Sequence, residues 1–400
     1  MNTLDKVKKM KPEDIIQKLV SAGLKDYGVH REKLSEKLDA AMAESHKTGN
    51  SMKLVAALDN SDTSGVLLDI LKENPVKIME GLSIIAYSLN IKDKIICIPE
   101  YAEAYVSELQ ATANTYGIDI NLGLVDHRHY KGSLIIHLIT AGEIVEYLNN
   151  EYSCGVYVSV NGQQLRKVLP DIKISDLLSG VEEIKALRLG GRIYKPDALN
   201  LTVEQANITN GVIQSFTHND CMICETEKLL SASRQQSCGR CVFCREGLIQ
   251  LQNMHKDITE GKGKLDYIPI INEIGDAMAY STNCSLGQTS SDIALSVLNN
   301  FNEEYETHIK KKICQANVCT ALTGIYIDPE ICQGCGDCMD ICPTDCIAGK
   351  SGYIHMIDEF DCTKCGRCIE VCEAGAIKKS VGKLPKLPDR LTKCGRFKKR

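Results

Sequence analysis

The chain has 400 residues, 20 of them cysteine, and its 47 Lys and Arg stand against 52 Asp and Glu, for a net charge of −5. This length suits two to four domains, and the near balance of charge disfavours binding to nucleic acid or to an acidic membrane surface. No apolar run approaches the roughly 18 residues that span a bilayer, and the opening MNTLDKVKKMKPEDII lacks a signal-peptide core. We therefore expect a cytoplasmic protein with no membrane span, in which thiols serve as metal ligands rather than disulfides.

Residues 1–150 alternate short apolar strands with helical segments. Leu54–Leu58 and Lys94–Tyr101 have the composition of buried strands, and residues 75–89 and 102–116 have the apolar periodicity of helices. The order strand, helix, strand, helix predicts an α/β sandwich with a parallel sheet, of Rossmann-like type.

The pattern changes in residues 151–205, where VYVSVNG reads as a strand, DIKISDLL as a short helix and IKALRLGG as another strand. This order predicts a small α+β module of β-grasp type. Residues 206–305 return to helical spacing and predict a bundle. The rest of the chain divides into a linker, a cysteine-rich module and a basic tail, at 306–325, 326–380 and 381–400. We expect the tail to be an extended, solvated arm.

The strongest pattern in the chain is the pair ICQGCGDCMDICP and DCTKCGRCIEVCE. Each has three cysteines at C-x2-C-x2-C and a fourth after three more residues, as in bacterial two-cluster ferredoxins, in which each fourth cysteine ligates the other cluster. We therefore predict two 4Fe–4S clusters here. A pair of structural zinc sites is the alternative, and the interleaved spacing disfavours it. Quartet A is Cys332, Cys335, Cys338 and Cys372, and quartet B is Cys342, Cys362, Cys365 and Cys368.

A third group of cysteines lies in the helical region. SCGRCVFCREG supplies Cys238, Cys241 and Cys244 at the same spacing, and TNCSLG supplies Cys284 after 39 intervening residues. A loop triad and one distant cysteine can close a 4Fe–4S site, although zinc could use the same four thiolates. We call these four residues the helical quartet.

The segments SCGRCVFCREG and TNCSLG closely resemble the cluster region of the NADH-binding flavoprotein subunit of respiratory complex I. Its relatives, the beta subunits of electron-bifurcating iron hydrogenases of anaerobic metabolism, also carry a C-terminal two-cluster ferredoxin. KENPVKIMEGLSIIAYSL and the strand before Glu100 and Tyr101 look like the flavodoxin-like half of this family. The resemblance implies an SLBB-like β-grasp module, a four-helix bundle that holds a cluster, and three 4Fe–4S clusters that relay electrons between partner subunits.

The resemblance fails where this family binds FMN and NADH. The glycine-rich FMN loop of the family corresponds to LKDYGVHRE (24–32), which has one glycine, Gly28. LDNSDTSG (58–65) lacks the paired glutamates and the proline of a second family segment, and 120–133 and 137–141 replace two more. Close approach of a backbone to a phosphate requires glycines. We therefore expect a degenerate site with no FMN, and a diverged site that retains flavin is the alternative.

The linker contains a candidate zinc site. THIKKKICQANVCTAL places His308, Cys314 and Cys319 close together, and one imidazole with two thiolates suits zinc. The hydrogenase relatives have a similar stretch and also place a cysteine near Cys221, which makes it our first choice as fourth ligand. Buried thiols beside a solvated histidine are the alternative interpretation. Other candidates for the fourth ligand are Cys224, Cys346 and Cys394.

The remaining thiols and imidazoles receive structural or solvated roles. Cys97 and Cys154 lie in apolar, strand-like runs and are expected in the core, and Cys346 is expected beside a ferredoxin cluster without ligating it. No metal is assigned to the three histidines of the shortened 120–141 region, which are His127, His129 and His137.

These observations predict a flavin-free iron–sulfur electron-transfer subunit of a larger cytosolic oxidoreductase. Single electrons would pass through the three clusters to a partner subunit or to a soluble ferredoxin. No catalytic residue is assigned, and a catalytic partner subunit is expected. The alternatives are an FMN-containing NADH dehydrogenase subunit with a divergent flavin site, electron-bifurcating or not, and a structural hub held together by its clusters.

Overall fold

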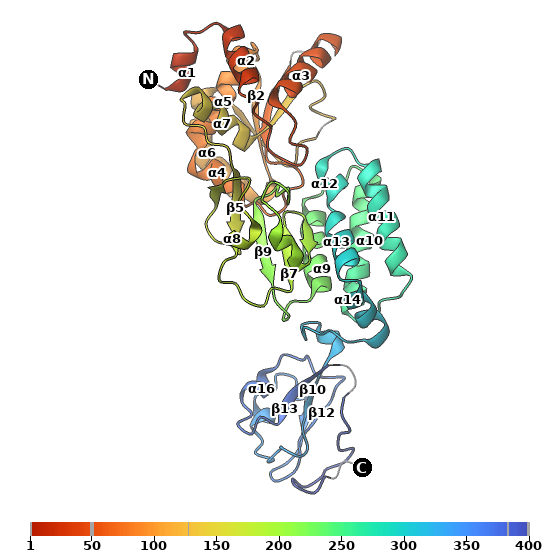
Figure 1. Ribbon diagram of the computed structural model, residues 1–400. Helices are drawn as coiled ribbons and strands as arrows, with labels where there is room; N and C mark the ends of the chain where they lie inside the picture. The colour runs from red at the N-terminus through yellow and green to blue at the C-terminus, as the bar shows by residue number, and fades with distance from the viewer. Residues whose placement is uncertain (1, 49–51, 127, 382–383, 398–400) are drawn as a thin grey trace. The chain divides into compact units, whose positions relative to one another are not determined.

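A computed structural model of the chain describes residues 2–48, 52–126, 128–381 and 384–397. The chain divides into two compact units, which are treated separately below (Figure 1). Within the described ranges, no helix combines the length and the apolar character needed to cross a membrane. Unit 1 comprises Met1–Phe216, Leu229–Leu251 and Ile271–Ser296, and unit 2 comprises Thr217–Lys228, Gln252–Ile270 and Val297–Arg400.

Unit 1 contains a four-stranded sheet in which every pairing is parallel, with strand order β3-β2-β1-β4. Apart from Lys94 at the start of β2, β1 and β2 are built of apolar residues that are buried on both faces, as in a parallel sheet covered by helices. The predicted α/β architecture with a parallel sheet is therefore confirmed. Strand order reverses at β1, which is where doubly wound folds form a ligand crevice. The strands are β1 (Leu54–Ala57), β2 (Lys94–Ile98), β3 (Asp119–Leu122) and β4 (Leu134–His137).

Helices α5 (Pro75–Ser88) and α7 (Leu138–Leu148) pack on each other and on β1. Their close approach depends on Gly81, because a Cβ there would lie 1.9 Å from the carbonyl oxygen of Ala141. Pro75 opens α5 at a position where its missing N–H has no helical partner to lose. The other helices of this part are α1 (Thr3–Val7), α2 (Pro12–Ser21), α3 (Leu34–Thr48), α4 (Leu68–Glu73), η1 (Glu100–Tyr105) and α6 (Val106–Tyr116).

A second sheet in unit 1 has five strands in the order β6-β5-β9-β7-β8. β5 and β9 pair in parallel and the other pairs are antiparallel. β9 lies beyond residue 205, where we expected this module to end, because GVIQSF continues the period-2 pattern after a turn. The elements are β5 (Val156–Val160), β6 (Arg166–Val168), α8 (Ile174–Leu177), β7 (Ala186–Leu189), β8 (Arg192–Tyr194), η2 (Pro196–Asn200) and β9 (Val212–Phe216).

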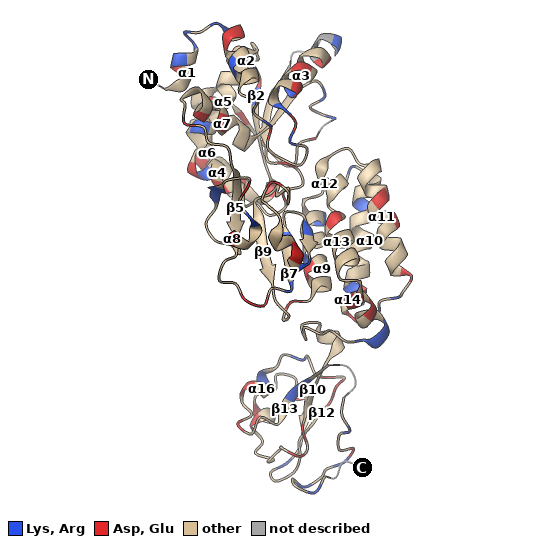
Figure 2. Ribbon diagram, viewed as in Figure 1, with Lys and Arg blue, Asp and Glu red and all other residues tan. Residues whose placement is uncertain are grey.

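The segment that follows is helical, and acidic and basic residues are interspersed along its helices (Figure 2). The division between the two units falls within its four longest helices, so each unit holds part of each of these. The helices are α9 (Met222–Gln236), α10 (Val242–Thr259), α11 (Tyr267–Ser281), α12 (Ser285–Thr289), α13 (Asp292–Asn300) and α14 (Asn302–Glu306).

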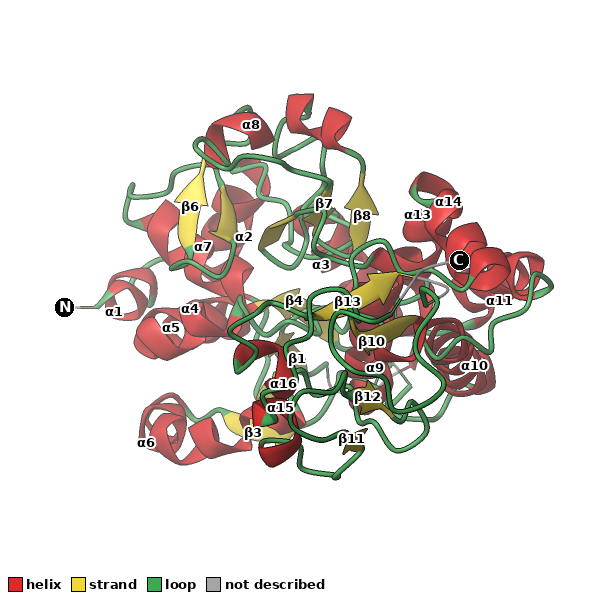
Figure 3. Ribbon diagram, turned by 90° about the horizontal axis from the view of Figure 1, so that it is seen from below, coloured by secondary structure: helices red, strands yellow, loops and turns green. Residues whose placement is uncertain are grey.

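The C-terminal part of unit 2 is a ferredoxin-like module with a twofold repeat. One antiparallel strand pair joins its ends, a shorter pair lies between, and the short helices α15 and α16 contact each other (Figure 3). Each half places a cysteine loop directly before its short helix. The elements are β10 (Thr323–Ile327), α15 (Asp337–Asp340), β11 (Ile347–Ala348), β12 (Met356–Ile357), α16 (Arg367–Glu370) and β13 (Ile377–Val381).

The tail is not wholly the extended arm that we expected. Tyr353 and Lys393 form an antiparallel bridge. Backbone N–H groups of Ile354 and Cys394 donate to the carbonyls of Thr392 and Gly352 at 2.9 and 3.1 Å. The prediction overlooked these bonds because backbone pairing does not depend on the basic side chains that the sequence displays.

Candidate metal centres

The helical quartet lies in the loops before α10 and α12 and in the first turn of α10, all within unit 1. Three of its members, Cys238, Cys241 and Cys284, line one cavity of about 160 Å³. Burial raises the pKa of the Cys244 thiol, and the three other sulfurs add to the shift. Burial also raises the pKa of Cys284, with a smaller contribution from Cys238. Because neighbouring thiolates repel one another, a cationic metal centre would stabilise all four.

The two ferredoxin quartets occupy equivalent positions in the repeat of unit 2. All four cysteines of quartet B line one cavity. Burial raises the pKa of Cys368, and the three other sulfurs of quartet B add to the shift. Cys342 therefore lies with the three cysteines of the second motif, as interleaved ligation requires. In quartet A, burial raises the pKa of Cys338 to about 12, and two sulfurs of the same quartet add to it.

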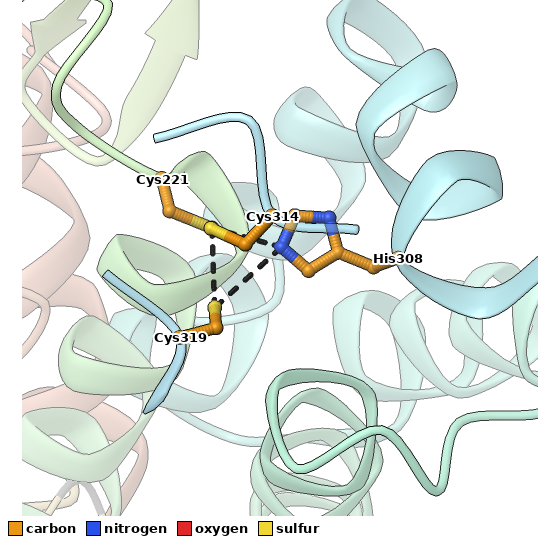
Figure 4. Close-up of side chains that lie close together, drawn as sticks. All are labelled: Cys221, His308, Cys314 and Cys319. Atoms are coloured by element: carbon orange, nitrogen blue, oxygen red, sulfur yellow. Dashed lines mark hydrogen bonds between the residues drawn. The ribbon is translucent and has the colours of Figure 1, made fainter. Parts of the chain in front are cut away.

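The linker site is the group Cys221, His308, Cys314 and Cys319, which the structure brings together in unit 2 (Figure 4). Its four ligand atoms all lie within 4.8 Å of one another. Nε2 of His308 is 3.3 Å from Sγ of Cys221 and 3.5 Å from Sγ of Cys319, and those two sulfurs are 3.8 Å apart. Ligand atoms around a tetrahedral zinc lie roughly 3.5–3.8 Å apart, given the Zn–N and Zn–S bond lengths. The residues therefore fit zinc in donor type and in spacing.

A backbone carbonyl orients the histidine of the linker site. His308 lies in the π-helical turn η3 (Thr307–Lys311), and such turns are frequent at functional sites. Its Nδ1 is 2.8 Å from the carbonyl oxygen of Glu304. Nδ1 therefore carries the hydrogen and donates it, which leaves the lone pair of Nε2 free to face the sulfurs. Metal-bound histidines are commonly held in this way.

Three more cysteines lie beside these sites. Sγ of Cys224 is 3.3 Å from Sγ of Cys319, next to the linker site. Sγ of Cys346 is 3.4 Å from Sγ of Cys342 in quartet B, and Cys394 contacts quartet A. Of the alternatives for the fourth ligand of the linker site, Cys346 and Cys394 therefore lie elsewhere.

The expectations for the remaining thiols and histidines are confirmed in part. Cys97 is 3% exposed, which confirms its place in the core. The same expectation is wrong for Cys154, which is exposed because it lies in the loop before β5. His129 is exposed, and His127 lies outside the described residues.

A second cavity of about 160 Å³ lies at the carboxyl ends of β1 and β4, and we call it the sheet cavity. Its lining includes Asp26, Lys37, Asp59, His137 and Cys284. Asp26 forms an ion pair with Lys37 and accepts the backbone N–H of His137 at 2.9 Å. Burial lowers the pKa of His137 to about 4, so this imidazole is neutral at physiological pH. The polar groups of this cavity are therefore bonded largely to one another.

Asp59 ties three segments together at the sheet cavity. Its carboxylate accepts the backbone N–H groups of Val29 and Ser61, each at 2.9 Å, and the hydroxyl of Ser285. Burial acts to raise the pKa of Asp59, but these hydrogen bonds hold it below its usual value. Gly28 has φ +116°, and a Cβ there would lie 2.7 Å from the Asp59 carboxylate. Gly28, the one glycine of residues 24–32, thus leaves space for the side chain of Asp59.

Asp62 lies three residues after Asp59, in the turn that follows β1, and the residue is 2% exposed. Its Oδ1 accepts the N–H groups of Ser64 and Gly65 at 3.0 and 3.1 Å, while its Oδ2 is buried without a partner among the described residues. Burial raises its pKa to about 6. The phenol oxygen of Tyr101 would lie 2.7 Å from a Cβ on Gly65, so Tyr101 packs against this turn.

Comparison with known proteins gives two matches to iron–sulfur families. Residues 225–308 match the NADH-ubiquinone oxidoreductase-F iron-sulfur binding region, and residues 324–373 match the 4Fe-4S dicluster domain. The HndC subunit of the NADP-reducing hydrogenase of Solidesulfovibrio fructosivorans is 37% identical over 146 residues, which are 36% of this chain and 30% of HndC. Over these parts, the chain is similar to HndC and to F subunits of NADH-quinone oxidoreductases. The resemblance predicted from the sequence is confirmed.

A second curated protein and a solved structure are also similar to this chain. The F subunit of the NADH-quinone oxidoreductase of Streptomyces coelicolor is 32% identical over 102 residues, which are 26% of this chain and 23% of that subunit. Each of these two matches spans less than a third of the relative's own length. An NAD+-reducing NiFe hydrogenase, solved in its H2-reduced state, shares the fold with a TM-score of 0.64 at 14% identity. That likeness covers 75% of this chain and 63% of the hydrogenase chain.

Proposed function

We propose that the chain relays single electrons within a multisubunit oxidoreductase and has no flavin of its own. The observation that carries this proposal is that all three cysteine quartets lie in segments that match iron–sulfur families. The helical quartet lies in residues 225–308, and quartets A and B lie in residues 324–373. A 4Fe–4S cluster carries one electron at a time and needs no substrate pocket. The chain's own cysteine thiolates would hold the clusters, and in each quartet one of them is buried: Cys244, Cys338 or Cys368.

The cluster assignment follows the predicted ligand sets. We assign one 4Fe–4S cluster to the helical quartet, one to quartet A and one to quartet B. Within each set, burial and neighbouring sulfurs raise the pKa of one thiol: three sulfurs act on Cys244 and on Cys368, and Cys332 and Cys335 act on Cys338. This is the environment in which binding of an iron cluster relieves the mutual repulsion of thiolates.

We assign zinc to the linker site. Its His308 and three cysteines are buried, with exposed fractions of 1–3%, and burying such polar groups without a partner costs free energy. A bound zinc would offset that cost and cross-link the peptide between the two matched segments. Its role is structural, because four protein ligands leave no open coordination position for a substrate.

Two observations support the absence of a flavin. The sheet cavity holds about 160 Å³, which is below the roughly 300–1,000 Å³ of most ligand pockets. The carboxylates of Asp26 and Asp59 line this cavity, and Asp59 accepts a hydrogen bond from the backbone N–H of Val29. A phosphate group would meet negative charge where it needs free N–H donors. FMN therefore does not fit the residues present.

We assign the modules around these sites from the resemblance to the same family. We assign the five-stranded sheet to an SLBB-like β-grasp module and helices α9, α10, α11 and α13 to a four-helix bundle that holds the helical quartet. The two relatives described above are subunits of a hydrogenase and of an NADH-quinone oxidoreductase. We propose that this chain likewise works beside a catalytic subunit, and that it passes electrons to that subunit or to a soluble ferredoxin.

Reduction of the isolated chain tests the proposal. Under anaerobic conditions, dithionite should reduce all three clusters, as followed by electron paramagnetic resonance, and NADH alone should reduce none. The second candidate, an FMN-containing NADH dehydrogenase subunit, predicts reduction by NADH without a partner. The third, a structural hub, predicts clusters that neither reagent reduces.

A further inference from the structure

The linker site has one more thiol than a tetrahedral zinc can use. Sγ of Cys224 lies 3.3 Å from Sγ of Cys319, closer than the 3.8 Å between Cys221 and Cys319. Cys224 lies in the first turn of α9, and Cys221 directly precedes that helix. A tetrahedral site accepts four ligands, and the linker site already has four without it.

Cys224, the fourth thiol at this site, is also the accessible one. Cys224 is partly exposed, whereas Cys221, Cys314 and Cys319 are 1%, 1% and 3% exposed. A dissolved oxidant therefore meets Cys224 before it meets the ligands. Thiol–disulfide exchange depends on such access as well as on the thiolate.

We infer that Cys224 is a redox-active thiol that forms a disulfide with Cys319 and so releases the metal of the linker site. The oxidant is a low-molecular-weight disulfide, of which oxidised glutathione is the example used below. This inference rests on the zinc assigned above, although the disulfide itself can form whether or not the metal is bound.

The reaction takes two exchange steps. The Cys224 sulfur attacks one sulfur of oxidised glutathione, which forms a mixed disulfide and releases one glutathione. The Cys319 sulfur then attacks the sulfur of Cys224, so its bond to the metal and the mixed disulfide bond both break. A second glutathione leaves as thiolate. The two protein sulfurs lose two electrons, oxidised glutathione gains them, and the proton of Cys224 ends on the first glutathione released.

Loss of Cys319 leaves three ligands, Cys221, His308 and Cys314, and an incomplete set holds zinc less tightly. In the sequence, the linker residues 309–323 join the two segments that match iron–sulfur families. An oxidised linker would therefore lose the cross-link that fixes it. The cell's thiol–disulfide balance would act on the connection between iron–sulfur modules without direct attack on a cluster.

The test uses the full chain, purified anaerobically and incubated with oxidised glutathione. Retained zinc is measured by mass spectrometry after desalting, and disulfides are mapped in peptides. The variants are Cys224→Ser and, as a matched control, Cys154→Ser, which removes an exposed thiol far along the sequence from the linker site. Iron content before oxidation shows that each variant has folded with its clusters.

Wild type and Cys154→Ser should lose zinc and yield a peptide that joins Cys224 to Cys319. Cys224→Ser should bind zinc normally before oxidation and lose it roughly tenfold more slowly. Equal loss from Cys224→Ser, or a disulfide between Cys221 and Cys224, would overturn the inference. So would loss of zinc from Cys224→Ser before oxidation, because Cys224 would then be a permanent ligand. If wild type binds no zinc, the zinc assignment fails, and the mapped disulfide alone decides the inference.

Discussion

The linker site and the sheet cavity are both clusters of buried polar side chains, yet they are organised in opposite ways. In the linker site, three sulfurs and Nε2 of His308 face one another within 4.8 Å. In the sheet cavity, the carboxylates of Asp26 and Asp59 accept the backbone N–H groups of His137, at the end of β4, and of Val29. The first arrangement leaves ligand atoms for an ion. In the second, both carboxylates are bonded to protein groups, although Nε2 of His137 is buried without a partner among the described residues.

On the function proposed above, the scaffold persists while its flavin site does not. The parallel sheet keeps the reversal of strand order at β1, where doubly wound folds bind ligands. Asp59 bridges the loop at Val29 to Ser285, beside Cys284 of the helical quartet. Asp59, which lies just beyond the carboxyl end of β1, thus supports the segment that carries a cysteine of the quartet. Substitutions at the two sites test this contrast, from the largest expected effect to the smallest.

Removing a linker-site ligand should have the largest effect. We expect Cys314→Ala to lower zinc from about one per chain to near zero, because the site has four protein ligands. Cys154→Ala should retain zinc. Metal analysis of the desalted proteins makes the measurement. Zinc at the wild-type level in Cys314→Ala would show that the four side chains do not form the binding site.

Removing the central carboxylate of the sheet cavity should destabilise unit 1. Asp59→Ala leaves the partly buried N–H groups of Val29 and Ser61 without this acceptor, at a cost of about 2–4 kcal/mol. Asp59→Asn keeps one acceptor oxygen and should cost about half as much. Thermal unfolding followed by circular dichroism compares the two. A loss below about 1 kcal/mol in Asp59→Ala would contradict the bridging role.

The buried carboxyl of Asp62 should give a pH-dependent effect. Its folded-state pKa of about 6 lies above the ordinary 3.8. The stability that it contributes is therefore fully present below about pH 4 and is lost as pH rises through 6. Asp62→Asn removes this loss and should gain up to about 3 kcal/mol relative to wild type between pH 4 and 7. Thermal midpoints across that range provide the measurement, and parallel wild-type and variant profiles would contradict it.

His137 affects the pH dependence of stability in the opposite direction to Asp62, so the same measurement also tests its role. Burial lowers its folded-state pKa to about 4, below the ordinary 6.5. The stability that it contributes is present above pH 6.5 and is lost as pH falls toward 4. In wild type, the changes of stability with pH that Asp62 and His137 cause are opposite in sign and largely cancel. In Asp62→Asn, stability should therefore rise with pH across this window.

The smallest effect concerns Tyr27, whose hydroxyl accepts the N–H of Tyr157 in β5 at 3.2 Å. Tyr27→Phe leaves that N–H unpaired and should cost about 1 kcal/mol of unfolding free energy. Tyr280→Phe is the matched control, because Tyr280 is 90% exposed. Equal midpoints for the two variants would show that this hydrogen bond contributes nothing measurable.

The sequence predicted the metal centres better than it predicted the sheet cavity. Quartets A and B follow from short-range spacing alone, because cluster loops are compact. The linker site spans Cys221 to Cys319, and the resemblance rather than the spacing suggested Cys221. The network of Asp59 went unpredicted because its partner Ser285 lies 226 residues away. Periodicity identifies which residues are buried, but it does not identify their hydrogen-bonding partners.

The composition of the anaerobically purified chain, alone and in its native complex, tests the central claim most directly. We predict about twelve irons and about one zinc per chain, from three 4Fe–4S clusters and the linker site, and no acid-extractable flavin. One FMN per chain would contradict the account, because the sheet cavity would then open to a flavin and the chain would oxidise NADH itself.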